Sequence, residues 1–304
     1  MLQQALQSIA AQSYRDWEVV VVDDGSDPAV TEEDISRVVG DRFRLLHHPQ
    51  PHGTAAAKNC GIAAASGDLI TLLDDDDLLE PFALQSIIEA FASHHDIDCL
   101  FLNITPFGRH ADEATSNQGI ALEKIITSAA VHQGQQLVYL GTELFSTLLK
   151  TTPIPMQRPV ASPATWKMVG NFSPGIMCPE PVWAARAALM CKTALLSSPV
   201  YRWRVDGQNH ASRPAMQSAA TRCILEDRLL LLDTMQNGAL GKPPDRRALR
   251  TSIATLLQEQ SLESLAQGRR LEALRRLGNS LRYAVSWRSA KMAVRLLLPA
   301  PNTP

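Results

Sequence analysis

Residues 17–24 read WEVVVVDD, and this stretch decides the fold class of the chain. Four consecutive valines between polar residues predict a strand that is buried on both faces, as in a parallel sheet. Asp23 and Asp24 close the strand, and the sequence GSDP then breaks it.

Helical and extended patterns alternate on both sides of this strand. Helices are expected at Met1–Gln12, at residues 55–66 (AAAKNCGIAAAS) and from Pro81 to about His94. Further strands are expected at residues 43–46, 69–73 and 97–105. Strands that alternate with helices predict an α/β fold with a mostly parallel sheet flanked by helices.

A second acidic cluster, Asp74 to Asp77, follows the predicted strand LITLL at residues 69–73. Adjacent carboxylates raise one another's pKa, and a divalent cation such as Mg²⁺ or Mn²⁺ relieves their repulsion. Mg²⁺ commonly bridges one or two carboxylates and substrate phosphates. Parallel sheets bind ligands beyond the carboxyl ends of their strands, where both clusters fall. The alternatives are a solvated acidic loop before Pro81 and a plain turn at Asp23-Asp24-Gly25.

Composition narrows the class of protein. The chain has 304 residues, 45% of them apolar, and a net charge of −2, which gives no electrostatic reason to expect nucleic acid. Five scattered cysteines suggest neither a disulfide framework nor a zinc site. The start has no basic, apolar leader, and no stretch of the sequence is long and apolar enough to span a bilayer. A cytoplasmic protein is the simplest expectation.

One class with paired acidic strand ends is the receiver domain of two-component signalling. A receiver is a unit of about 120 residues that also needs a Thr or Ser and then a Lys at later strand ends. No such lysine follows the predicted strand at residues 97–105. A receiver-like domain is therefore the less favoured alternative.

The chain resembles the family 2 glycosyltransferases, which have the GT-A fold, over about residues 2 to 212. The first two blocks are the most specific. The blocks that carry the resemblance are ALQSIAAQSYRDWEVVVVDDGSDP (5–28), AAAKNCGIAAASGDLITLLDDDDLLEP (55–81), WKMVGNFSP (166–174), PEPVWAARAAL (179–189) and PVYRWRVDGQNHAS (199–212).

The resemblance implies a role for each matching residue. Asp24, with Asp23, would hydrogen-bond the nucleotide base, and Lys58 would lie near the nucleotide. Asp74 would face the ribose or the metal, and Asp75 occupies a variable position. Asp76 would bind the Mg²⁺ or Mn²⁺ ion that bridges the diphosphate. The implied reaction moves a sugar from a nucleoside diphosphate donor to a saccharide or lipid-linked acceptor, with inversion, in bacterial surface polysaccharide synthesis.

Two departures from the family pattern matter. Where the family usually has Glu-Asp or Asp-Asp at the catalytic base, this chain has Glu180-Pro181. Either Glu180 is the base, or another acid such as Asp206 is, or the chain is an inactive homologue that only binds a nucleotide sugar. The family also begins with a central strand ahead of the first helix. That strand is missing here, so the resemblance implies a longer natural protein.

Three regions are expected: a nucleotide-sugar-binding half at 1–105, an acceptor-binding half at 106–212 and a helical region at 213–304. Prolines make the middle region look loop-rich, with short elements. The last region predicts three or four helices, and residues 265–298 contain eight Lys or Arg and one acid. That basic surface is either an ordinary solvated face or a peripheral contact with anionic lipid at the inner face of the cell membrane.

Overall fold

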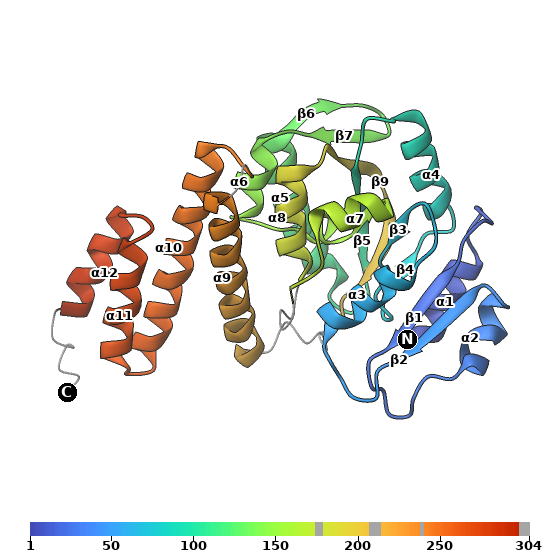
Figure 1. Ribbon diagram of the computed structural model, residues 1–304, viewed down its shortest axis with the longest axis horizontal. Coiled ribbons are helices and arrows are strands. Elements are labelled where there is room, and N and C mark those ends of the chain that lie inside the picture. The colour runs from blue at the N-terminus through green and yellow to red at the C-terminus, as the bar shows by residue number, and fades with distance from the viewer. Residues whose placement is uncertain (174–178, 207–213, 238–239, 298–304) are drawn as a thin grey trace. The chain divides into compact units, whose positions relative to one another are not determined.

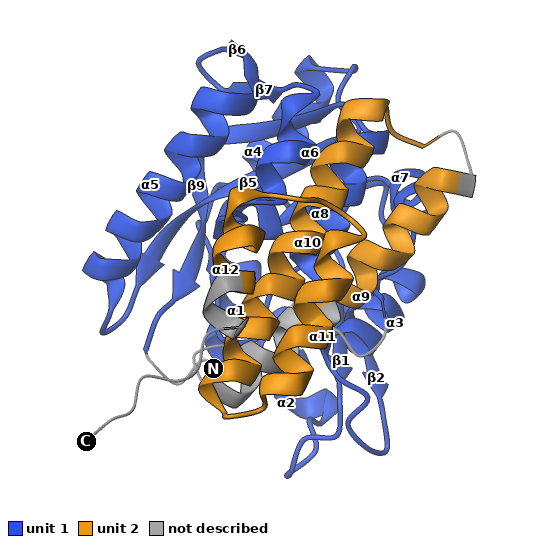
Figure 2. Cartoon of the chain, turned by 90° about the vertical axis from the view of Figure 1, so that its left-hand side faces the viewer, with its two compact units in different colours: residues 1–220 blue, residues 221–304 orange. Residues whose placement is uncertain are grey.

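The computed structural model describes residues 1–173, 179–206, 214–237 and 240–297 (Figure 1). The chain forms two compact units, residues 1–220 and residues 221–304, which Figure 2 colours separately. The first unit mixes strands and helices, and the described part of the second is helical.

The amino-terminal part of the first unit is a two-stranded parallel sheet with helices beside it. Its elements are α1 (Leu2–Ala10), β1 (Val19–Asp23), α2 (Glu32–Val39) and β2 (Phe43–His47). Leu6 of α1 and Ile35 of α2 are fully buried and pack with Val19 and Val21. These two valines share one face of β1 because side chains alternate along a strand, so they hold both helices to the sheet.

The valines of β1 are only half-buried, so the prediction of a strand covered on both faces is wrong. β1 pairs with β2 along Val19–Asp23, and no other described strand pairs with either of them. A strand with a single neighbour keeps one edge open to solvent. The expectation of a further strand stays a prediction.

A seven-stranded sheet forms the centre of the first unit. Its strands are β3 (Ile70–Thr71), β4 (Leu78–Leu79), β5 (Cys99–Phe107), β6 (Ala130–Gln133), β7 (Leu137–Leu140), β8 (Pro159–Ala161) and β9 (Thr193–Arg204). The hydrogen-bonded order is β3-β8-β5-β9-β7-β6, and β4 pairs with β9. The strand predicted at 69–73 is shorter than expected, because the chain turns at Asp74, whose carbonyl accepts the N–H of Asp77 at 3.1 Å.

The strand directions correct the expectation of a mostly parallel sheet. The pairs β1–β2 and β5–β9 are parallel, whereas β3–β8, β4–β9, β5–β8, β6–β7 and β7–β9 are antiparallel. Only three residues, 134–136, join β6 to β7, and so short a connection permits a hairpin but no crossover. The fold is α/β with a mixed sheet.

The central strand β5 is buried on both faces. Phe101 packs with Trp183 in one apolar cluster, while Leu100 and Leu102 pack with Ile87 in another. Because successive side chains point to opposite faces, this single strand anchors both layers of the core.

Helices cover this sheet (Figure 1). They are α3 (Thr54–Ala64), α4 (Ala83–Ser93), α5 (Ala111–Ala129), α6 (Glu143–Leu148), α7 (Pro163–Val169) and α8 (Glu180–Met190), with a 3₁₀ turn at Ile154–Gln157. The helices predicted at 55–66 and 81–94 are confirmed. The loop-rich prediction for the middle region is wrong, since α5 has 19 residues and β9 has 12. The prolines did not mark loops. Pro163 and Pro181 lie in the first turns of α7 and α8, where a backbone N–H has no hydrogen-bond partner within the helix.

The second unit contains the helices predicted for the end of the chain. They are α9 (Pro214–Asn237), which begins before the unit boundary, α10 (Pro243–Ala266), α11 (Arg270–Leu281) and α12 (Trp287–Leu297). Ala273, Leu277 and Met292 form a small buried cluster between α11 and α12. Among the described residues, none of the helices has the length and apolar character that a bilayer crossing requires.

Candidate active site

Helix α3 touches both acidic clusters. At its start, the Gly53 N–H donates to Asp24 Oδ2 at 2.7 Å. Farther along, Lys58 Nζ lies 2.8 Å from Asp74 Oδ1. A helix rises about 1.5 Å per residue, so the backbone of Lys58 lies about 7.5 Å beyond that of Gly53 along its axis. One helix thus links the end of β1 to the turn after β3.

The carboxylate of Asp23 forms hydrogen bonds within the turn that follows β1. Its buried carboxylate accepts the N–H groups of Ser26 and Val30, each at 2.9 Å, and lies 3.2 Å from His47 Nδ1. Burial opposes ionisation, but these hydrogen bonds outweigh it and lower the pKa of Asp23 to about 2. Its observed contacts stabilise the backbone around Asp24.

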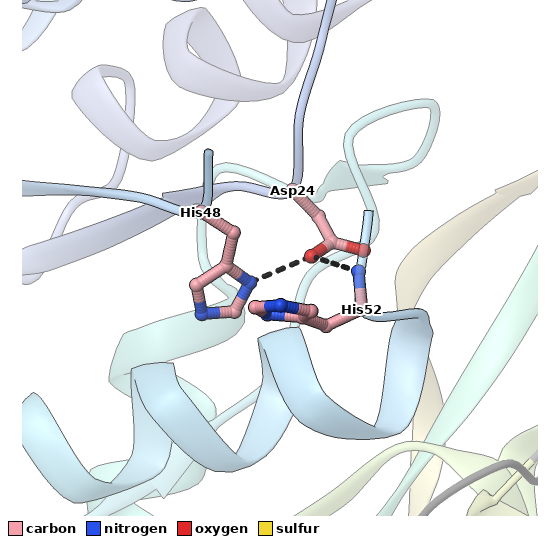
Figure 3. A group of neighbouring side chains, drawn as sticks. All are labelled: Asp24, His48 and His52. Atoms are coloured by element: carbon pink, nitrogen blue, oxygen red, sulfur yellow. Dashed lines mark hydrogen bonds and ion pairs between the residues drawn. The ribbon is translucent and has the colours of Figure 1, made fainter. Parts of the chain in front are cut away.

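Asp24 is half-buried and is held from several sides (Figure 3). It accepts the N–H groups of His52 and Gly53 at 2.9 and 2.7 Å, and lies 2.6 Å from His48 Nδ1. Burial would raise its pKa, but the bonds from His52, His48 and Gly53 keep the pKa of this carboxyl below its usual range. Gly25 has φ +82°, and a Cβ there would meet Pro51 Cδ at 2.8 Å. A glycine is therefore required for this close approach.

Lys58 joins two carboxylates from different parts of the chain. Its ammonium contacts Asp74 Oδ1 and also forms an ion pair with Glu180 Oε1. Glu180 is buried at the start of α8. Burial lowers the affinity of an amine for a proton, but the charges of Asp74 and Glu180 dominate and raise the pKa of Lys58. The structure therefore brings three of the predicted site residues together.

Arg158 is a buried cation that sequence reasoning missed. Its Nη2 lies 3.0 Å from Asp74 Oδ2 and 3.1 Å from Asp77 Oδ2. Burial works against ionisation of Asp74, yet Lys58 and Arg158 together hold the pKa of Asp74 well below its usual range. No sequence signal pointed to Arg158, which stands 84 residues from Asp74 and outside every recognised block.

Asp77 is the buried end of the acidic turn. Its Oδ2 accepts the Tyr201 hydroxyl at 2.8 Å and its Oδ1 accepts the Arg204 N–H at 2.8 Å. Burial raises the pKa of Asp77 although Arg158 opposes the rise. Tyr201 and Arg204 lie in the block PVYRWRVDGQNHAS, so that block contained a signal for these partners. The network fixes the turn to β9.

Asp76 differs from its neighbours. Its backbone carbonyl accepts Arg204 Nε at 2.6 Å, but its carboxylate has no cation or hydrogen-bond donor from another described residue. Burial and the repulsion of Asp77, Asp74 and Asp75 raise the pKa of Asp76 to about 6. Asp75 is exposed. An unbalanced carboxylate among hard oxygen donors fits Mg²⁺ or Mn²⁺, whose charge would stabilise its ionised form.

Asp206, the other acid considered as a base, has a different setting. Its Oδ1 accepts the Arg109 N–H at 3.0 Å, and its Oδ2 lies 3.6 Å from Arg204 Nη1. The end of the recognised block, residues 207–212, lies outside the described residues, as does Pro174 in the block at 166–174. None of the hydrogen bonds or ion pairs in the described part of the chain joins Asp206 to Lys58 or Asp74.

Comparisons with known proteins support the family resemblance. Residues 1–140 match the family model for glycosyl transferase family 2. The resemblance to family 2 glycosyltransferases is therefore confirmed over residues 1–140. An uncharacterized glycosyltransferase of Nostoc sp. is 25% identical over 243 residues, which cover 74% of this chain and 68% of that protein. The O-antigen biosynthesis protein RfbC of Myxococcus xanthus is 33% identical over 106 residues, which are 33% of this chain but only 8% of RfbC.

Solved structures show that the chain has the GT-A fold. Residues 1–349 of S. aureus TarS, in complex with UDP-GlcNAc, match 93% of this chain and 78% of theirs, with a TM-score of 0.62 and 17% identity. A mannosyltransferase from Pyrobaculum calidifontis, in complex with GDP-Man and Mn²⁺, matches 97% of this chain and 74% of its own, with a TM-score of 0.54 and 15% identity. The predicted family and GT-A fold are confirmed.

Proposed function

We propose that this glycosyltransferase moves a sugar from a nucleoside diphosphate donor to a saccharide or lipid-linked acceptor, with inversion and with Mg²⁺ or Mn²⁺. The observation that carries the proposal is the turn Asp74–Asp77, where Lys58 and Arg158 hold Asp74 and Asp77 while the partly buried Asp76 has no cation among the described residues. Structural neighbours of the same fold bind UDP-GlcNAc or GDP-Man, the latter with Mn²⁺.

The chain's residues divide the work of holding the donor. Asp24, fixed at the start of α3, would accept hydrogen bonds from the base. Asp74 would face the ribose, and Lys58, about one and a half turns from Gly53, supplies positive charge near the phosphates. Asp76 would ligate the cation, which neutralises charge on the departing nucleoside diphosphate. Asp23 contributes by holding the backbone of this subsite.

Glu180 is the proposed base for the acceptor. A carboxylate at this place would take the proton of the acceptor hydroxyl as the oxygen attacks the anomeric carbon, and attack from the side opposite the leaving group inverts the centre. Lys58 contacts both carboxylates and so links Glu180 to Asp74 of the acidic turn. For Glu180 to accept a proton, its ion pair with Lys58 must lengthen when the acceptor binds.

That ion pair favours a second candidate function. Glu180 is buried and paired with Lys58, and Pro181 stands where the family has an acid. A chain whose base is held in this way would bind a nucleotide sugar without transferring it. The competing proposal is therefore a binding protein without catalytic activity.

Donor hydrolysis separates the two functions. Purified protein is incubated with UDP- and GDP-sugars and Mn²⁺, and release of the nucleoside diphosphate is measured against an EDTA control. The enzyme hydrolyses at least one donor slowly and in proportion to protein, and Asp76→Asn removes this activity. Thermal stabilisation by a donor without release supports the binding protein. If no donor stabilised the protein and none released its nucleoside diphosphate, both proposed functions would be contradicted.

The membrane contact is proposed for the second unit. Three apolar residues are exposed there, Leu281, Val285 and Trp287, and they neighbour in the chain the exposed basic residues Arg282 and Arg288. These residues lie at the connection between α11 and α12, and apolar and basic side chains close together in the chain suit the interface of an anionic bilayer. A cytoplasmic enzyme attached there could reach a lipid-linked acceptor, in keeping with surface polysaccharide synthesis.

Vesicle flotation tests this contact. The protein should float with vesicles that contain phosphatidylserine and not with pure phosphatidylcholine. Trp287→Ala should weaken the association, whereas Leu230→Ala, an exposed leucine on α9, should not. Equal recovery with both vesicle types would contradict the proposal.

A further inference from the structure

Three side chains from separate segments converge at the edge of the two-stranded sheet (Figure 3). Asp24 follows β1, His48 follows β2, and His52 precedes α3. One candidate ligand atom from each lies within 4.8 Å of the other two. His48 Nδ1 is 2.6 Å from Asp24 Oδ1, and the two imidazole centroids are 4.7 Å apart.

We propose that Asp24, His48 and His52 bind a divalent transition metal ion such as Zn²⁺. Two imidazoles and one carboxylate are a donor set typical of zinc, and three protein ligands leave a fourth position open. Zinc bonds of about 2.0–2.1 Å set tetrahedral donors about 3.4 Å apart. To reach that value the His48–Asp24 pair must open from 2.6 Å and the wider spacing must close, which requires both imidazoles to rotate; the side chain of His52 is exposed.

The backbone holds the carboxylate of this site in place. The N–H groups of His52 and Gly53 bind Asp24 at 2.9 and 2.7 Å, and such outer contacts orient a ligand before the metal arrives. Gly53 adopts φ +91°, which directs its N–H toward the carboxylate and would strain any other residue. The site therefore needs adjustment of imidazole rings only.

This site differs chemically from the turn Asp74–Asp77. The turn offers carboxylate oxygens, which suit the hard ions Mg²⁺ and Mn²⁺. The imidazoles of His48 and His52 favour zinc, copper, nickel or cobalt. The two places can therefore be filled selectively, with Mg²⁺ in the turn and a transition metal at the histidines.

Metal at the histidines has a consequence for the donor, which rests on the proposed function. The carboxylate of Asp24 is the group proposed to accept hydrogen bonds from the nucleotide base. A carboxylate oxygen of Asp24 that ligates zinc cannot accept a hydrogen bond from the nucleotide base at the same time. Zinc at this site therefore competes with the donor, independently of the ion at Asp76.

Metal binding is measured first, without nucleotide. Zn²⁺ is titrated by calorimetry, and Co²⁺ by its ligand-field absorption, with excess Mg²⁺ present to occupy the acidic turn. The expected result is one ion per chain with tetrahedral Co²⁺ bands. His52→Ala should lower the affinity at least about tenfold, since loss of an outer contact alone commonly costs that much. His95→Ala removes an exposed imidazole elsewhere and should change nothing. Equal affinity in wild type and His52→Ala overturns the site.

Competition is measured second. In wild type, Zn²⁺ should weaken UDP binding at least about tenfold, whereas in His52→Ala the same Zn²⁺ should have little effect. Direct binding of zinc to UDP would weaken UDP binding equally in both proteins, so the comparison with His52→Ala controls for it. Unchanged UDP affinity in zinc-loaded wild type overturns the competition. A chain that binds zinc through His52 but no nucleotide would overturn the proposed function and leave the metal site standing.

Discussion

The end of β1 and the turn after β3 look alike in sequence but differ in their electrostatics. Asp23 and Asp24 receive hydrogen bonds from backbone N–H groups and histidines, and both have a pKa below the usual range. The turn Asp74–Asp77 instead depends on buried cations, and its Asp76 has a raised pKa. A run of aspartates at a strand end can thus be either a satisfied turn or a charge that needs a partner.

The largest expected effect comes from removing the buried cation that stabilises the turn Asp74–Asp77. Arg158→Ala leaves Asp74 and Asp77 without their shared guanidinium in a buried place. Removing one partner of a buried ion pair costs about 3–5 kcal/mol. The free energy of unfolding, measured by urea titration, should fall by about that amount. Arg202→Ala is the matched control, because its pair with Glu80 at 3.8 Å is partly exposed and is worth about 0–1 kcal/mol. Equal losses in both variants would contradict the network.

Asp76→Asn tests whether the unpaired carboxylate is the one that matters for function. Without it the cation is poorly held, and charge on the leaving group is less stabilised. Metal-dependent donor hydrolysis should fall about 100-fold, which is about 2.7 kcal/mol in the barrier. Asp75→Asn, at the exposed neighbour, should keep most activity. If the two variants lost activity equally, the distinction between these positions would be wrong.

Asp23→Asn tests the satisfied cluster. An amide would turn an N–H₂ toward the Ser26 or Val30 N–H, so at least one hydrogen bond to a charged group is lost. Such bonds contribute about 1.5–3 kcal/mol, and the free energy of unfolding should fall by about 2 kcal/mol. Asp41→Asn, at an exposed position outside this turn, is the control and should be near neutral. A stable Asp23→Asn protein would show that these bonds are replaceable.

The sequence predicted the parts of this comparison that are local. Apolar strands followed by acids revealed both clusters, and the alanine-rich stretch around Lys58 predicted the helix that carries it. The partners of the acids were not predictable in the same way, because Arg158 and Tyr201 are brought to Asp77 by pairings 81 and 124 residues long. His48 and His52 escaped notice because their approach to Asp24 depends on the pairing of β1 with β2.

The half-buried valines of β1 show the same limit of local patterns. A run of four valines predicts burial, but the burial of a strand depends on which strands pair beside it, and VVVV does not contain that information. The direction of β7 was equally hidden, since a three-residue connection reverses it against β6.

The smallest expected effect is the pH dependence that Asp76 contributes without metal. Its folded pKa of about 6 lies above the ordinary aspartate value of 3.8, so the folded chain binds a proton more tightly than the unfolded chain and loses stability as pH rises between these values. Asp23, whose pKa is lowered to about 2, acts in the opposite direction and only below about 3.8. Because Asp76 is partly exposed, solvent screening reduces its contribution to about 1 kcal/mol. Urea titrations in EDTA at pH 4 and pH 6.5 should show this loss in wild type relative to Asp76→Asn, and Mn²⁺ should restore the stability at pH 6.5. An identical pH dependence in both proteins would mean that Asp76 is already balanced, and the contrast between the two acidic strand ends would disappear.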